Sequence, residues 1–134
     1  MKPDAKMIPA GILGPALILA LLFAACGESE VARHARQITG GDPGQGLVLV
    51  RKYGCNGCHM VPGAPGAKTG GKTGPPFEGV GSRPTLAGGL PNTPQNLIRW
   101  IRDPQSMSRG TQMPTLGVSE QDSRDLAAFL YTLR

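Results

Sequence analysis

Two cysteines and a histidine stand together in the segment Cys55-Asn56-Gly57-Cys58-His59. A Cys-x-x-Cys pair serves structural zinc sites, redox disulfides or the covalent attachment of a prosthetic group. A structural zinc site takes four ligands, usually from two such pairs, and the only other cysteine in the chain is Cys26. A thioredoxin-like disulfide accompanies alternating strands and helices, and no strand-like alternation surrounds this motif. The zinc and disulfide interpretations are therefore both disfavoured.

The histidine directly after the second cysteine favours a haem. Two thiols three positions apart can each add to one vinyl group of the macrocycle, and His59 can bind the iron through an imidazole nitrogen. The chain has 20 Gly and 13 Pro but only 4% aromatic residues, so its own apolar surface is thin for a domain of 134 residues. A covalently held macrocycle supplies the missing core. We therefore expect one haem c, held by Cys55, Cys58 and His59.

The first 25 residues are typical of an export signal. Two lysines precede a largely apolar stretch whose uninterrupted part, 16–25, is too short to span a bilayer comfortably. We interpret residues 1–25 as a signal peptide, with an uncleaved anchor as the alternative. The junction 22–26 resembles a bacterial lipobox, in which Cys26 is lipidated; an ordinary signal that leaves Cys26 as a spare thiol is the other interpretation. We expect export, with a lipid anchor at the outer face of the bacterial cytoplasmic membrane or in the periplasm.

Residues 26–42 are predicted to form a flexible tether. The segment carries several charged side chains and offers no sizeable apolar face for packing. It contains His34, the only histidine besides His59 and hence an alternative iron ligand. A solvated histidine in a tether is the interpretation we favour.

Three helices are predicted within the domain 43–134, each from a capping residue followed by apolar positions at helical spacing. The first spans 42–53 and leads directly into the cysteine motif. The second spans 93–103, and the third begins at Ser119 and continues to the end of the sequence. The sequence therefore predicts an all-α domain of three to four short helices with long loops rich in Pro and Gly.

A second axial ligand is needed unless the iron is to bind a small molecule, and the sulfur candidates after Cys26 are Met60, Met107 and Met113. Met60 is adjacent to the motif histidine and cannot easily reach the opposite face, while Met107 is expected just past the end of a helix. Met113 is the best candidate because it lies in a non-helical segment between two helices, where Pro114 stiffens the backbone. Thioether ligation raises the reduction potential, and a six-coordinate iron favours electron transfer over substrate chemistry.

From about Pro43 to Arg134 the sequence resembles the class I cytochromes c. The landmarks occur in order along the chain: a helix with Gly46, then Cys55–His59, Gly74-Pro75, Gly79–Arg83, a helix ending in proline, Met113-Pro114 and Asp125–Leu130. The stretch 80–104 is closer still to the haem c domain fused to subunit II of some haem-copper oxidases. That subunit's copper-binding domain has no counterpart here, so the resemblance implies a free-standing, membrane-tethered relative.

The resemblance also implies roles for individual residues. The carbonyl of Pro75 would accept a hydrogen bond from Nδ1 of the motif histidine and fix its ring. Arg83 would hydrogen-bond or pair with a haem propionate, and Trp100 would pack on the methionine side of the haem. The first and last helices would cross where Gly46 and Val50 meet Leu126 and Phe129.

The charge balance bears on partners. Residues 26–134 carry twelve Lys and Arg against eight Asp and Glu, a surplus that favours docking to an acidic partner. Nucleic acid is disfavoured because the chain has no dense basic run with aromatics. We predict a non-catalytic carrier of single electrons, with a terminal oxidase or a quinol-oxidising complex of a respiratory or photosynthetic membrane as its partner. The alternatives are a haem subunit fixed in a larger oxidoreductase complex and a haem sensor that binds a gas or peroxide.

Replacing both motif cysteines tests the attachment. In the Cys55→Ala/Cys58→Ala variant we expect no haem to stay bound after denaturation, because neither thioether bond can form. The apoprotein should be largely unfolded, since its core lacks the macrocycle. Haem content after denaturation and circular dichroism before it measure the two effects, and a well-folded apoprotein would contradict the second.

Overall fold

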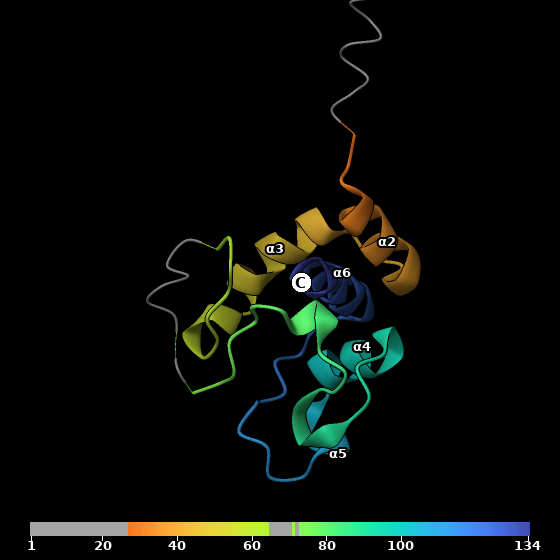
Figure 1. Cartoon of the computed structure of the whole chain (residues 1–134). Helices are drawn as coiled ribbons and strands as arrows, with labels where there is room; N and C mark the ends of the chain where they lie inside the picture. Colours follow the sequence, from red (N-terminus) through yellow and green to blue (C-terminus); the bar gives the residue numbers. More distant parts are fainter. Residues whose placement is uncertain (1–26, 65–70, 72) are drawn as a thin grey trace, which may run out of the picture.

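The computed structural model describes residues 27–64, 71 and 73–134 (Figure 1). The predicted signal peptide and Cys26 lie outside the described residues. Within those residues the chain is helical, and the paired extended backbone is limited to an isolated bridge between Thr85 and Pro91. The all-α fold predicted from the sequence is therefore confirmed. None of the described helices is long and apolar enough to cross a membrane.

Helix α6 is the element against which most of the described chain packs. The α-helices are α2 (Glu30–Thr39), α3 (Pro43–Lys52), α4 (Pro94–Arg102), α5 (Pro104–Met107) and α6 (Glu120–Thr132). The short 3₁₀ helices are η1 (Cys55–Gly57), η2 (Val80–Ser82) and η3 (Ala87–Gly89). Helices α2, α3 and α4 all contact α6, which runs through the middle of the molecule in Figure 1. The sequence predicted α3, α4 and α6 but neither α2 nor α5.

Each of the three predicted helices begins at the capping residue expected for it. The side chains of Asp42, Thr93 and Ser119 accept hydrogen bonds from backbone N–H groups of the first turns of α3, α4 and α6. The start of α3 has a further hydrogen-bond partner in Asp125 of α6. Its carboxylate accepts the backbone N–H of Asp42 at 2.7 Å. The start of α3 is thereby tied to α6 as well as capped.

Helices α3 and α6 cross at Gly46. A Cβ at this position would collide with the carbonyl oxygen of Asp125 and would lie 2.6 Å from Cβ of Phe129. Only glycine lets the two backbones approach so closely. One turn along α3, Val50 is fully buried, and Leu126 and Phe129 of α6 are 2% and 6% exposed. The crossing is therefore the centre of the core, as the resemblance to cytochromes c implied.

The prediction of a flexible tether over 26–42 is wrong for residues 30–39, which form α2 and pack against α6. Ala35 is fully buried and Thr39 is 2% exposed. The Thr39 hydroxyl donates to the carbonyl of Ala35 at 2.8 Å and accepts the N–H of Gly41 at 3.1 Å. The fully buried positions of α2 are small, so no stripe of large apolar side chains marks this helix in the sequence.

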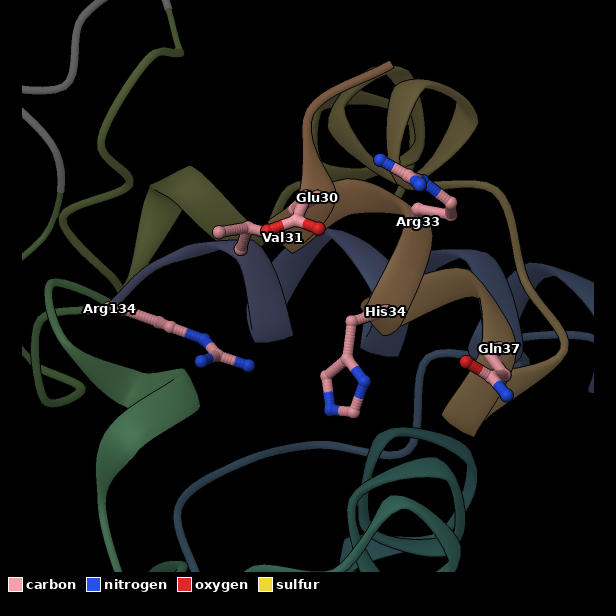
Figure 2. Close-up of a pocket in the computed structure, with 6 residues that line it drawn as sticks. All are labelled: Glu30, Val31, Arg33, His34, Gln37 and Arg134. Carbon is pink, nitrogen blue, oxygen red and sulfur yellow. The ribbon is translucent and has the colours of Figure 1, made fainter. Parts of the chain in front are cut away.

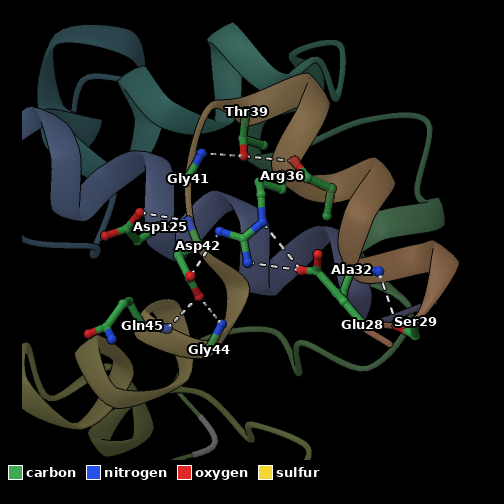
Figure 3. Close-up of polar contacts among 11 residues, drawn as sticks. Glu28, Ser29, Ala32, Arg36, Thr39, Gly41, Asp42, Gly44, Gln45 and Asp125 are labelled. Carbon is green, nitrogen blue, oxygen red and sulfur yellow. Dashed lines mark hydrogen bonds and ion pairs between the residues drawn. The ribbon is translucent and has the colours of Figure 1, made fainter. Parts of the chain in front are cut away.

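A polar network joins the end of α2 to the start of α3 (Figure 3). Arg36 donates to Glu28 at 2.9 Å and to Asp42 at 2.8 Å. The hydrogen bond with Arg36 holds the pKa of the Asp42 carboxyl below its usual value. All three side chains are well exposed, so solvent screening limits what these ion pairs contribute to stability. The buried contacts of Ala35 and Thr39 are the main reason that α2 stays docked.

Gly46→Ala tests the helix crossing. The added methyl group has no room against α6, so we expect the free energy of unfolding to fall by about 1–3 kcal/mol. Gly44→Ala on the same helix is the matched control, because the neighbour its Cβ would meet is the Asp42 carboxylate at 3.1 Å. That variant should stay within about 1 kcal/mol of the parent. Denaturant unfolding of the holoproteins compares the two, and equal effects would contradict the close crossing.

Candidate haem site

The cysteine motif is a tight turn at the end of α3. Gly54, with φ of 70°, turns the chain from α3 into η1 in a conformation that favours glycine. The backbone N–H groups of Cys58 and His59 then both donate to the carbonyl of Cys55, at 3.2 and 3.0 Å. Both thiols are free, and burial raises the pKa of the Cys55 thiol, so it is protonated at neutral pH. The turn thus presents two thiols and one imidazole from a single short loop.

Residues 71 and 73–77 lie alongside this motif. Three backbone hydrogen bonds join the two segments, from Gly71 to Asn56, from Gly74 to Cys58 and from Phe77 to Met60, at 2.9 to 3.1 Å. The pairing places the carbonyl oxygen of Pro75 2.7 Å from Nδ1 of His59. This is the hydrogen bond that the resemblance implied. With Nδ1 donating to the carbonyl, Nε2 is left free to bind a metal.

The same segment fixes the plane of the imidazole. A Cβ at position 74 would collide with the His59 ring, so the close approach of the ring requires Gly74. The Phe77 ring stacks on the imidazole, with 4.3 Å between centroids and 24° between planes. Sequence reasoning missed Phe77. The signal for it was its place as the first aromatic after the motif, within a loop otherwise rich in Pro and Gly.

Two adjoining cavities, of about 240 and 260 Å³, lie beside this imidazole. Their walls are mostly apolar, and His59, Phe77, Trp100 and Met113 line both. The first cavity also reaches both motif thiols, and the second reaches Leu97 and Leu130 of the core. The seven haem-site residues named from the sequence therefore meet around this pair of cavities: Cys55, Cys58, His59, Pro75, Arg83, Trp100 and Met113.

Helix α4 supplies the inner wall. Leu97, Trp100 and Ile101 are 3%, 7% and 6% exposed, which is the apolar stripe predicted for this helix. Leu97 and Trp100 each line a cavity as well as the core. A large aromatic side chain held this rigidly offers the broad apolar surface that a flat macrocycle needs.

Met113 reaches the cavities from the segment 108–119 between α5 and α6. It is the only methionine among the described residues that line them. Met107, expected in a loop, is instead the last residue of α5. Met60 accepts the N–H of Phe77 through its carbonyl and belongs to the paired backbone beside the motif. Of the three sulfur candidates, Met113 alone shares a cavity with His59 in the described chain.

His34 lies elsewhere, on α2. Figure 2 shows its ring in an open groove of about 520 Å³ that also includes Arg33 and Arg134. The side chain is exposed, and among the described residues it lines neither cavity next to His59. The exposure agrees with the interpretation favoured from the sequence, although the surrounding segment is a helix.

Arg83 stands at the second cavity with its guanidinium already anchored. One terminal nitrogen, Nη2, donates to the carbonyls of Pro76 and Glu78 at 2.6 and 2.7 Å. A guanidinium carries five N–H donors in a fixed fork, and those on Nε and Nη1 have no hydrogen-bond partner among the described residues, so they can serve an anionic group. The anchoring holds these donors in place.

Tyr53 is a second lining residue that sequence reasoning did not single out. Its hydroxyl donates to the carboxylate of Asp122 on α6 at 2.7 Å, and Lys52 bonds the same oxygen at 2.9 Å. The hydrogen bond from Tyr53, which has the larger effect, and the one from Lys52 hold the pKa of Asp122 below its usual value. The end of α3, and with it the start of the cysteine motif, is thereby fixed to α6.

The residues present fit a covalently attached haem. Two free thiols border an apolar cavity, a neighbouring imidazole keeps one nitrogen free, and Gly74 leaves the room that its ring occupies. Fold and site together define a small all-α protein of the c-type haem class.

Comparison with known proteins agrees with this class. The family profile for cytochrome c matches residues 42–134, so the chain belongs to the cytochrome c family, and its cofactor is covalently bound haem c. It is 42% identical over 91 residues to cytochrome c oxidase subunit 2 of Alkalihalophilus pseudofirmus. The aligned region covers 67% of this chain and 25% of the relative. It is 33% identical over 82 residues to the protein of the same name from Bacillus sp. strain PS3, and that aligned region covers 60% of this chain and 23% of the relative.

The chain spans about a quarter of the length of these curated relatives. Helix α2 lies before the part that matches the family. No solved structure matches the chain significantly.

Proposed function

We propose that this protein is a membrane-tethered monohaem cytochrome c that carries single electrons without catalysing a reaction of its own. The observation that carries the proposal is the shared cavity, in which His59 and Met113 are brought together beside two free thiols. A histidine and a methionine on one iron leave no position open for substrate, which suits electron transfer.

Each lining residue has a task in this proposal. Cys55 and Cys58 would form the thioether bonds, and His59 would bind the iron through Nε2 while Pro75 holds the ring by its 2.7 Å hydrogen bond. That bond also makes the imidazole a stronger ligand. Trp100 excludes water from the apolar wall, and Arg83 directs its free donors to a propionate.

The haem supplies a one-electron couple between ferric and ferrous iron. As a ligand, Met113 would raise the reduction potential of that couple, because a soft thioether favours the ferrous form. The buried residues of α4 and α6 keep the surroundings apolar and rigid, so little rearrangement is required when the charge changes.

A respiratory partner is the second part of the proposal. The matched relatives bear the name cytochrome c oxidase subunit 2, which supports a terminal oxidase as the electron acceptor. We propose a quinol-oxidising complex as the electron donor. The surplus of basic residues favours docking to an acidic face of such a partner. We propose that the protein lies at the outer face of the bacterial cytoplasmic membrane or in the periplasm.

The anchor in this proposal is lipid on Cys26. Because α2 begins at Glu30 and packs on α6, only residues 27–29 separate Cys26 from the folded domain. The tether is therefore much shorter than the sequence suggested. The domain stays close to the lipid surface instead of swinging over a wide arc.

A second candidate is a haem subunit fixed in a larger oxidoreductase complex. It is favoured by the match to one quarter of an oxidase subunit, because that segment works there as part of a longer chain. Purification from gently solubilised membranes separates the two candidates. A free carrier elutes alone, and a subunit elutes with stoichiometric partners.

Met113→Ala tests the axial ligand. We expect the reduction potential to fall by on the order of 0.1 V or more, because the ligand that favours ferrous iron is lost. Carbon monoxide or cyanide should bind readily at the vacated position. Met60→Leu and Met107→Leu are the matched controls and should change neither property. If the parent protein already binds carbon monoxide fast and Met113→Ala changes nothing, the carrier proposal gives way to a sensor or a catalyst.

Cys26→Ser tests the anchor. We expect the variant to leave the membrane fraction while its visible spectrum stays unchanged, because the site of acylation is gone and the haem site is untouched. Fractionation followed by haem staining measures the distribution. Continued retention in membranes would point to an uncleaved apolar segment instead of a lipid.

A further inference from the structure

The segment that carries Met113 has little secondary structure of its own. Residues 108–119 contain no helix or strand, yet a metal ligand must be held in one place. The segment's hydrogen bonds within itself are few: the N–H of Met113 donates to the hydroxyl of Thr111 at 3.3 Å, and the N–H of Thr111 donates to the carbonyl of Ser108 at 3.2 Å. Besides the buried Val118 near its end, the segment is held by contacts with the neighbouring helix.

Gln105 provides those contacts. It lies in α5, and its side-chain nitrogen Nε2 donates to the carbonyl of Thr111 at 2.8 Å and to the carbonyl of Met113 at 3.0 Å. A carboxamide nitrogen has two hydrogens, so one Gln105 side chain satisfies both carbonyls at once. The two bonds fix the backbone on either side of Gln112 and at the ligand residue itself.

The helix that carries Gln105 is firmly seated. Pro104 is fully buried in the core, and Asp103 caps the helix by accepting the N–H of Ser106 at 3.3 Å. The same Asp103 oxygen accepts the hydroxyl of Thr115 at 3.4 Å, two residues beyond Met113. The Met113 segment is thus tied to the junction of α4 and α5 both at and after the ligand.

We propose that Gln105 is a positioning residue for Met113, which holds the thioether toward the cavity through these two donated hydrogen bonds. The inference rests on the proposed ligation of iron by Met113. Gln105 is exposed and adds little to the core, so its loss should loosen the ligand segment without unfolding the domain. An exogenous ligand enters only when Met113 leaves the iron, so a looser segment means faster entry.

Two variants separate hydrogen bonding from bulk. Gln105→Ala removes both donors, and Gln105→Glu keeps the shape of the side chain but offers only acceptors at neutral pH, facing two carbonyl oxygens. In the ferric holoprotein we expect both variants to bind cyanide about tenfold faster than the parent. A change of this order is expected when two hydrogen bonds of modest net strength are lost. The far-red sulfur-to-iron charge-transfer band should be lost at lower pH than in the parent.

The controls decide what a negative result means. Gln37→Ala on α2 removes an exposed glutamine far from this segment along the chain and should match the parent in both measurements. Thermal unfolding of all variants should change little. If Met113→Ala speeds cyanide binding while both Gln105 variants match the parent, the Gln105 inference is wrong and the ligation stands.

Two further outcomes would also overturn the inference. If Gln105→Glu behaves like the parent and only Gln105→Ala binds cyanide faster, the volume of the side chain and not its hydrogen-bond donation holds the segment. If Met113→Ala itself leaves the band and the cyanide rate unchanged, Met113 is no ligand, and both the ligation and the role of Gln105 are wrong.

Discussion

The close crossing of α3 and α6 at Gly46 is the constraint on which the rest of the structure depends. With no Cβ at this position, the two backbones touch, and Asp125 of α6 accepts the backbone N–H that starts α3. At its other end, α3 is held to α6 by the bond from Tyr53 to Asp122. A helix fixed at its start, middle and end delivers the cysteine motif to one defined place. Helix packing therefore positions the cysteine motif, and the haem that it holds completes the core.

Helix α6 also holds α4 and η2. Helix α4 packs on it and presents Trp100 to the cavity, while the N–H of Gly81 in η2 donates to the carbonyl of Leu133 at 2.8 Å. Residues 73–77 bring the carbonyl of Pro75 to the imidazole. Helix α2 adds a further layer on α6 outside the part that matches the family. In the proposed function, the short segment between a lipid on Cys26 and the docked α2 would keep the domain near the membrane and restrict the faces it offers to a partner.

Much of this site follows from sequence because local chemistry specifies it. The motif at 55–59 indicates covalent attachment of a haem, and capping residues followed by apolar stripes predict α3, α4 and α6. Other features depend on contacts between distant residues that no local pattern shows. The fully buried positions of α2 are small, the stacking of Phe77 requires the return of the loop, and the hold of Gln105 on Met113 requires that α5 form at all. The resemblance to cytochromes c supplied Pro75 and Trp100, which spacing alone did not.

X-ray absorption at the iron edge of the purified ferric holoprotein tests the central claim most directly, because it reads the atoms bound to the metal. The account predicts a single sulfur at bonding distance among nitrogen ligands, and loss of that sulfur in Met113→Ala while the haem stays attached. A first shell of nitrogen alone, or of nitrogen with oxygen, in the parent protein would contradict ligation by Met113 and with it the closed, electron-carrying iron.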